Sequence, residues 1–445
     1  MATYQAYAEY KDSGVEWLEV IPSHWTSIAI KFLALDKNSL FLDGDWIESK
    51  DISDSGIRYI TTGNVGTGFY KEQGSGFITE FTFKKLSCSE VYAGDILISR
   101  LNLPIGRACI VPDLNNRIVT SVDNVIFRPD EEYHPKFLVY LFSSKEYFQN
   151  TENIARGATM QRISRGLLGN IRVVMPSKDE QTQIANFLDH ETAKIDHLIE
   201  KQQQLIELLK EKRQAVISHA VTKGLNPNVP MKDSGVEWLG EVPEHWIVCP
   251  IKYELKSQDF RRIPLSSEER GRKTGEYRYY GASGVIDYID EYIFDESTVL
   301  VGEDGANLVT RNTPLAFAAH GQYWVNNHAH ILKPTDGLAD YWAEVIEMID
   351  ISSLVSGSAQ PKLTAEALNN LKIAFSEDMN ERVQIEHFIK QTKNKYDVLI
   401  DKAQCQVSLL SERRTALISA AVTGKIDVRH WKAPTVAEAD TELSA

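Results

Sequence analysis

The longest regular pattern in the chain runs from 179 to 221, a stretch without proline or glycine. Apolar residues recur in it at alternating steps of four and three, and Glu, Gln, Lys, Leu and Ile dominate, which favours a helix. Seven of ten seam positions are apolar, as is typical of a coiled coil. We predict a helix of about 40 residues, roughly 60 Å long. The apolar seam positions are Ile184, Leu188, Ile195, Leu198, Leu205, Leu209 and Val216.

The same pattern returns 201 residues later. EQTQIANFLD at 180–189 matches ERVQIEHFIK at 381–390, and KRQAVISHAVTKGL at 212–225 matches RRTALISAAVTGKI at 413–426. Further apolar residues lie beside the first seam and widen the apolar stripe, which predicts that each helix contacts something besides the other helix. These residues are Ile199, Ile206, Leu208 and Ile217. The second seam consists of Ile385, Ile389, Tyr396, Leu399, Ala403, Leu410 and Leu417, and polar residues interrupt the two seams at Glu191, Gln202 and Lys212 and at Thr392, Gln406 and Arg413.

A second repeat opens each half of the chain. KDSGVEWL stands at 11–18 and again at 232–239, an offset of 221, followed in both copies by a proline and a His-Trp pair at matched positions. Each half therefore consists of an opening and a closing helix that are shared by both halves, and of a middle segment whose sequence differs between them. The different offsets make the second middle 20 residues shorter than the first. Equal ends with unequal middles indicate one scaffold that carries two different binding modules.

The two middles consist of short β-rich segments broken by Gly, Asn and Asp, namely Val91–Ile98, Ile118–Phe127, Tyr277–Tyr292 and Ser297–Val301. We predict an α+β fold: two mixed α/β domains with mainly antiparallel strands, separated by two long antiparallel coiled-coil helices and related by an internal pseudo-two-fold repeat. The predicted boundaries are 1–178 for the first domain, 179–223 for the central helix, 224–378 for the linker and second domain, 379–430 for the distal helix and 431–445 for a disordered tail.

The formal net charge of −14 argues against a solitary, tight nucleic-acid binder. Most of the acidity lies in 224–378, where 24 acidic residues outnumber 13 basic ones. A local basic patch can still contact phosphates, especially beside basic partner subunits. The four scattered cysteines and the absence of an apolar leader or an apolar stretch of spanning length favour a cytoplasmic protein without a membrane partner.

The repeated blocks resemble those of the specificity subunits of type I restriction-modification enzymes. The openings Trp17–Trp25 and Trp238–Trp246 resemble the start of their target-recognition domains, and the two closing blocks resemble their spacer helices. Gly157-Ala-Thr-Met-Gln161 and Gly357-Ser-Ala-Gln-Pro361 resemble the turn that closes such domains, and Tyr280–Gly284 and Val301–Gly305 also fit the family. The resemblance extends from about residue 10 to about residue 430. Each motif alone is weak evidence, whereas their duplicated order is specific.

The resemblance implies a DNA-recognition subunit without a catalytic centre of its own. Such a subunit reads a bipartite, asymmetric target on double-stranded DNA, one half-site per recognition domain. It binds two methyltransferase (modification) subunits, and restriction/translocase subunits can join. S-adenosylmethionine, ATP and Mg are then expected on these partners, and no cofactor or metal in this chain.

The candidate DNA contacts are Arg and Lys residues, which bind phosphate or guanine, and Gln residues, which pair with adenine. Most of them flank a glycine-containing turn or form a basic cluster, although a solvated surface charge is the commoner role of each residue alone. The paired tryptophans are expected as buried anchors rather than as base-stacking residues. The candidates are Arg156, Gln161, Arg162 and Arg165 in the first domain and Arg261, Arg262, Arg272, Lys273, Arg278, Gln360 and Lys362 in the second.

Two other functions remain open on the sequence alone. The chain could be a coiled-coil interaction scaffold with two binding modules and no role on DNA, or one domain could hide a nuclease. No phosphate loop, HExxH zinc motif or methyltransferase signature is present. Gly63–Gly68 lacks the strand and helix of a nucleotide-binding loop, and His320, His328 and His330 are expected as surface or hydrogen-bonded strand residues rather than metal ligands. The sequence does not give the DNA target.

Overall fold

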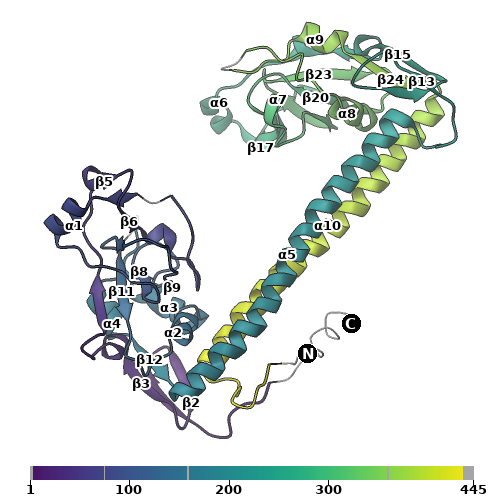
Figure 1. Ribbon diagram of the computed structural model, residues 1–445. Helices are drawn as coiled ribbons and strands as arrows, with labels where there is room; N and C mark the ends of the chain where they lie inside the picture. Colours follow the sequence, from purple (N-terminus) through teal and green to yellow (C-terminus); the bar gives the residue numbers. More distant parts are fainter. Residues whose placement is uncertain (1–3, 75, 158–159, 358–359, 434–445) are drawn as a thin grey trace. The chain divides into compact units, whose positions relative to one another are not determined.

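The computed structural model describes residues 4–74, 76–157, 160–357 and 360–433. It divides into unit 1, formed by 1–202 and 405–445, and unit 2, formed by 203–404 (Figure 1). Two long helices, α5 (Lys178–Lys223) and α10 (Met379–Val422), each contribute to both units. Within the described ranges, none of the helices combines the length and the apolar character that a membrane span requires.

Unit 1 is built on a central antiparallel sheet in the order β4-β11-β8-β9. A second sheet, β10-β6-β7-β5, contains one parallel pair, β10 with β6. The opening forms a hairpin of β1 and β2, and β3 pairs with β12 at the end of the domain. The strands are β1 (Tyr10–Val15), β2 (Leu18–Pro22), β3 (Thr26–Ala29), β4 (Leu40–Asp43), β5 (Ile52–Ser53), β6 (Ile57–Ile60), β7 (Phe77–Ile78), β8 (Ile96–Ser99), β9 (Ala108–Ile110), β10 (Ile118–Thr120), β11 (Asn124–Arg128) and β12 (Arg172–Met175), and the shorter helices are α1 (Glu80–Leu86), α2 (Pro135–Leu141), α3 (Lys145–Ile154) and α4 (Arg165–Asn170).

Unit 2 repeats this plan strand for strand in its central sheet, β16-β23-β20-β21, and in its terminal pair, β15 with β24. Its second sheet has the order β18-β17-β22-β19, again with one parallel pair. The strands are β13 (Met231–Asp233), β14 (Glu241–Pro243), β15 (Trp246–Pro250), β16 (Leu255–Ser257), β17 (Thr274–Gly281), β18 (Gly284–Ile289), β19 (Phe294–Asp295), β20 (Thr298–Gly302), β21 (Ala316–Ala319), β22 (Gln322–Val325), β23 (Ala329–Pro334) and β24 (Lys372–Ser376), and the shorter helices are α6 (Ser267–Arg272), α7 (Asn307–Thr310), α8 (Ala339–Glu347) and α9 (Ala365–Asn370). The predicted α+β fold with mainly antiparallel strands is confirmed.

The long helices run antiparallel within each unit (Figure 1). In unit 1, Gln183 donates to the carbonyl of Val428, whereas Asp196, further along α5, pairs with Arg414, which is earlier in the chain. In unit 2, Arg213 pairs with Asp397. α5 is followed by Gly224 and α10 by Gly424, with φ of +77° and +75°, and this left-handed conformation ends a helix. The helical part of the predicted distal segment therefore stops at Val422.

The predicted seam is wrong in part of one of its two columns: Ile184 and Ile385 in that column are fully buried, but the leucines that follow them are not. Leu198, Leu205 and Leu399 are 47%, 43% and 38% exposed. Their neighbours point inward instead: Ile206 is buried, and Ile199 and Ile400 are half-buried. In adjacent apolar pairs such as Leu205-Ile206, either residue fits the four-and-three spacing. The packing of the two helices decides which residue faces the partner helix, and it is the second one. Several of the supposed polar interruptions, Lys212, Gln406 and Arg413, are consequently exposed.

A buried carboxylate joins the start of α5 to the opening of unit 1. Glu180 is 5% exposed and accepts hydrogen bonds from Trp25 Nε1 (3.1 Å), His24 Nε2 (2.9 Å) and the Tyr7 hydroxyl (2.7 Å). Trp25 is fully buried, as expected of an anchor. Unit 2 repeats the arrangement, with Glu381 accepting from Trp246 Nε1 (3.2 Å) and His245 Nε2 (2.8 Å) and with Trp246 fully buried. The other two tryptophans of the openings, Trp17 and Trp238, are half-buried.

The two ends of the described chain meet in unit 1. The amide of Asp427 donates to the carbonyl of Gln5 (2.7 Å), and the rings of Tyr4 and Trp431 both contact Phe187, at centroid distances of 5.3 and 5.5 Å. Of the predicted tail 431–445, Trp431 is thus packed, and 434–445 lie outside the described residues.

Removing the Glu180 carboxylate should destabilise the protein. In Glu180→Ala, the buried indole and phenol donors of Trp25 and Tyr7 lose their acceptor, so we expect the free energy of unfolding to fall by about 3 kcal/mol. Urea unfolding measures the effect. Glu207→Ala, on the exposed face of α5, is the control and should change stability by less than about 0.5 kcal/mol. Equal effects of the two substitutions would contradict the assigned role.

Joining the termini and reopening the chain between 224 and 230 should preserve the fold, because Gln5 and Asp427, near the two ends of the described chain, are hydrogen-bonded and most of this linker is exposed. Thermal unfolding and circular dichroism of the permuted chain should match those of the parent. Failure to fold with several joining linkers would show that the 224–230 connection is required.

Candidate nucleic-acid interface

Each unit contains an equivalent loop near the end of its domain, and a pair of backbone hydrogen bonds closes this loop. In the first closing loop (described residues 156–157 and 160–162), Arg156 and Arg162 exchange amide and carbonyl at 2.9 Å in both directions. In the second closing loop (356–357 and 360–362), Ser356 and Lys362 do the same at 3.0 and 2.8 Å. The two loops therefore lie at matching positions, 200 residues apart in sequence.

A glycine is required at the start of both loops. Gly157 and Gly357 have φ of +118° and +89°, a region that favours glycine. A Cβ added at these positions would lie 2.3 Å from the carbonyl oxygen of Met160 and 2.6 Å from that of Gln360. The glycine of each predicted closing turn thus has a steric basis.

The closing loops attach to the segment that follows the central strand of each sheet. In unit 1, the amide of Ile163 donates to the carbonyl of Arg100 at 3.0 Å. In unit 2, the amide of Leu363 donates to the carbonyl of Glu303 at 2.8 Å. Arg100, which follows β8, and Glu303, which follows β20, are therefore structural equivalents of opposite charge.

The first closing loop lies on a cluster of arginines and aspartates. Arg100 is 5% exposed and pairs with Asp43 at 3.1 Å, and burial lowers the pKa of its guanidinium although Asp43 favours the charged form. Arg162 pairs with Asp123 (2.6 Å), and Arg165 lies 3.6 Å from Asp43. All four predicted residues of unit 1 thus belong to the loop or to the start of α4. Arg156 is exposed and has no side-chain partner among the described residues, and Gln161 Oε1 is buried without one.

The second closing loop lies on a cluster centred on a carboxylate. Glu303 is 9% exposed, pairs with Lys362 (3.1 Å) and accepts a hydrogen bond from Arg262. The pKa of Glu303 is lowered because these hydrogen bonds outweigh its burial. Arg262 also donates to the carbonyl of Ala329 (3.0 Å), and its side chain is 17% exposed, so it supports the site from within. Gln360 is exposed on the loop.

The remaining predicted residues of unit 2 belong to the second sheet and to the segments around it. Arg261 lies over the ring of Phe294 at 4.3 Å and pairs with Glu296, which makes it structural. Arg278 is exposed on β17, and its pKa is raised by a hydrogen bond to Tyr280. Arg272 pairs with Glu268 (2.5 Å) and Lys273 with Glu291 (2.6 Å).

The sequence analysis missed the interior of both clusters. Arg100, Asp43 and Asp123 in unit 1 and Glu303 and Asp259 in unit 2 follow or flank strands in the parts of the chain that do not repeat. The sequence signal that could have pointed to these clusters is the match of Ile163 with Leu363, beside the two similar turns. This match does not identify the side chains of the clusters, because strand pairing brings those side chains together.

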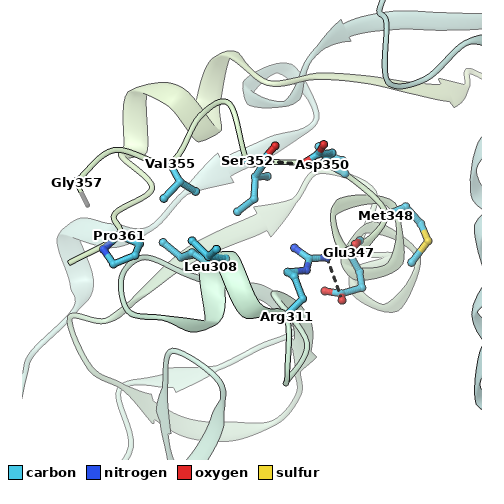
Figure 2. A pocket seen from close by; sticks show the side chains of 12 residues that line it. Leu308, Arg311, Glu347, Met348, Asp350, Ser352, Val355, Gly357 and Pro361 are labelled. Atoms are coloured by element: carbon cyan, nitrogen blue, oxygen red, sulfur yellow. Dashed lines mark hydrogen bonds and ion pairs between the residues drawn. The ribbon is translucent and has the colours of Figure 1, made fainter. Parts of the chain in front are cut away.

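Unit 2 contains a cavity of about 590 Å³ beside the second closing loop, lined in part by Leu308, Arg311, Glu347 and Pro361 (Figure 2). Glu347 accepts from Arg311 (3.2 Å) and from the amides of Leu315 and Ala316 (2.7 and 3.0 Å). Burial nevertheless raises its pKa. The polar groups of this cavity thus bind one another and support the start of β21.

The three candidate histidines between residues 320 and 330 each have a different carboxylate partner. His320 contacts Asp340 (3.3 Å), and His328 contacts Asp304 (2.9 Å), both with exposed rings. His330 is 2% exposed in β23 and contacts Asp259 (2.6 Å). Among the residues that the structure describes, no cluster of three or more His, Cys, Asp or Glu side chains has an arrangement that could hold a metal ion.

Comparison with known proteins identifies the class to which this repeated fold belongs. The sequence model of the type I restriction modification DNA specificity domain matches twice, at 40–208 and 258–402, and each match covers one closing loop. The chain therefore belongs to this family of specificity proteins.

Individual relatives agree with this assignment. The type I restriction enzyme MjaVIII specificity subunit of Methanocaldococcus jannaschii is 22% identical over 321 residues, which are 66% of this chain and 71% of that protein. The MjaIX specificity subunit of the same organism is 25% identical over 221 residues, 47% of this chain and 46% of that protein. Among solved structures, a chain described for the complex assembly and conformational transition of a type I restriction-modification system superimposes with a TM-score of 0.67 at 13% identity, covering 91% of this chain and 99% of that one. It shares the fold.

Substituting either loop glycine should strain the loop. We expect Gly157→Ala and Gly357→Ala each to lower the free energy of unfolding by about 1–3 kcal/mol, because the added methyl group meets a carbonyl oxygen and φ is positive. Gly166→Ala is the matched control, since nothing lies within 4 Å of the added Cβ. In helix α4 it should be neutral or stabilising, by up to about 1 kcal/mol. Urea unfolding of the three variants decides, and a neutral Gly157→Ala would contradict the assigned backbone constraint.

Proposed function

We propose that this protein is the DNA-target-recognition subunit of a type I restriction-modification complex and reads a bipartite, asymmetric target, one half-site per unit. The observation that carries the proposal is the pair of equivalent closing loops, each within a match to the DNA specificity domain. The two loops share their backbone geometry and differ in the charge beneath them. This combination supports two unlike half-sites, which we propose are separated by a non-specific gap.

Base contacts come from exposed side chains that no described carboxylate holds. Arg156 in unit 1 and Gln360 and Arg278 in unit 2 are exposed, and none of the three pairs with a described carboxylate. Arg and Gln match the edges of guanine and adenine, respectively. Arg162, Arg165, Arg272, Lys273 and Lys362 retain exposed surface and suit phosphate contacts, whereas Arg261 and Arg262 hold the domain together.

Two methyltransferase subunits bind along the long helices, one in each unit. Exposed leucines support this arrangement: Leu198 and Leu409 in unit 1 and Leu205, Leu208 and Leu399 in unit 2. Ordinary soluble surfaces carry few such side chains in a row. Each unit also has a groove beside the end of one long helix, about 820 Å³ in unit 1 and about 580 Å³ in unit 2.

Catalysis in the complex belongs to the partner subunits. The methyltransferase subunits hold S-adenosylmethionine, and restriction/translocase subunits hold ATP and Mg. This division is supported by the family match and by the internal use of the charged groups in the described clusters and in the unit 2 cavity. The chain by itself should bind DNA weakly, because its net charge of −14 opposes attraction to phosphates.

A domain exchange tests the one-unit, one-half-site assignment. Replacing 232–378 with the corresponding segment of a related subunit should change one half-site and leave the other intact. The measurement is genome-wide mapping of methylated adenines in cells that contain the parent or the exchanged chain together with the methyltransferase subunits.

Two controls make the result decisive. Cells without the chain should lack these methylated sites, and inserting matched heptads into both long helices should lengthen the gap while both half-sites persist. A change in both half-sites after the exchange, or a continuous palindromic target, would refute the assignment. No dependence of methylation on this chain, together with no salt-dependent retention on DNA in the presence of the methyltransferase subunits, would favour an interaction scaffold instead.

A further inference from the structure

The carbonyl that follows each closing loop is held by a different kind of side chain in the two units. In unit 1, the carbonyl of Ile163 accepts from Arg100 Nη1 at 3.2 Å. In unit 2, the carbonyl of the equivalent residue, Leu363, accepts from His330 Nε2 at 2.9 Å. A guanidinium keeps its charge at every physiological pH, whereas an imidazole does not. The same contact is therefore permanent in one unit and titratable in the other.

His330 occupies a core position of the central sheet. It pairs with Val301 of β20, and the equivalent register in unit 1 places Val125 opposite Ile98 of β8. Val125 is fully buried and His330 is 2% exposed. Unit 2 thus has an ionisable side chain where unit 1 has an aliphatic one.

Both ring nitrogens of His330 face acceptors. Nδ1 lies 2.6 Å from Asp259 Oδ2, and Nε2 faces the Leu363 carbonyl, which can only accept. The other oxygen of Asp259 already accepts from the amide of Ile331 at 2.8 Å. A neutral imidazole has one N–H and satisfies one of the two acceptors, whereas an imidazolium satisfies both. Burial alone would lower the pKa of His330, but the hydrogen bonds to Asp259 and Leu363 outweigh it, so the pKa is raised.

The charged groups around the ring come from several elements. Asp259 belongs to the short turn after β16, and Glu303, which follows β20, lies 3.8 Å from Nδ1. Arg262 lies 3.7 Å from Asp259 and binds Glu303, as does Lys362 of the loop. The two carboxylates favour the imidazolium, and the two cations partly neutralise those carboxylates.

We propose that His330 is a positioning residue for the second closing loop: its protonated ring ties Leu363 to β23 and to Asp259, so recognition by unit 2 weakens when the ring loses its proton, while recognition by unit 1, held by Arg100, does not. The proposal rests on the proposed function. Leu363 transmits this effect to the loop, because it is fully buried and directly follows Lys362. Its amide is hydrogen-bonded to Glu303 and its carbonyl to His330.

The test uses the complex with its methyltransferase subunits and three DNA duplexes: the native target, and targets with either half-site scrambled. The exchange of 232–378 assigns the half-sites to the units. The ratio of affinities for native and scrambled DNA is measured from about pH 6 to about pH 9, a range that spans histidine titration. The ratio for the unit 2 half-site should fall roughly tenfold as the pH rises, the loss expected from one unmade buried hydrogen bond. The ratio for the unit 1 half-site should stay constant.

Variants separate His330 from other titrating groups. His330→Gln should flatten the profile of the unit 2 half-site, whereas His320→Gln, the same change at an exposed ring, should leave the fall in place. If His330→Gln does not fold, the comparison of the two half-sites in the unmodified protein decides alone. Parallel profiles for both half-sites, or a fall that persists in folded His330→Gln, would overturn the inference. Absence of sequence preference at every pH would overturn the proposed function as well.

Discussion

The fold of each unit depends on one carboxylate in the first turn of a long helix. A buried carboxylate is stable only when donors surround it, and a buried indole needs an acceptor for its N–H. Glu180 and Trp25 satisfy each other, with His24 and Tyr7 as further donors. The positive end of the helix dipole also favours a negative charge at this position. In unit 2 the hydrogen bonds from Ser376, His245 and Trp246 lower the pKa of Glu381 against the effect of burial.

This junction explains why the ends of each half repeat while the middles differ. The His-Trp opening and the helix-starting glutamate are distant in sequence, and the pairs β3–β12 and β15–β24 lie beside them. Together they close each domain at its base. The middle then has to preserve only the strand order of the central sheet, which is the same in both units although the chain between its strands varies in length. Arg100 and Glu303 occupy equivalent positions after the central strand and have opposite charges, so side-chain charge can change while the strand order stays the same.

The sequence predicted what is periodic or repeated. The two long helices and the division into two domains were predicted from spacing and from matched blocks, and the closing glycines from the resemblance to the family. The seam was wrong in part of one column because Leu198-Ile199 and Leu205-Ile206 offer two apolar residues where the spacing needs one, and the choice between them depends on the partner helix. The clusters beneath the loops could not be predicted, because Asp43 and Arg100, or Asp259 and His330, meet only through the pairing of non-repeated strands. His330 lies in a strand and is hydrogen-bonded, as one of the expectations for it stated, but its link to the loop was not visible in the sequence.

The acidity of unit 2 has a structural explanation with a functional consequence. Many of its acidic side chains bind its own cations: Glu296 holds Arg261, Glu303 holds Arg262 and Lys362, and Glu291 holds Lys273. These carboxylates fix the cations in place and cancel their long-range attraction for phosphate. A unit arranged in this way gains little from non-specific electrostatics, which dominates weak DNA binding. Under the proposed function, such a unit would contribute discrimination at short range by side chains such as Gln360 and Arg278, and the attraction that brings DNA to the complex would come from the partner subunits.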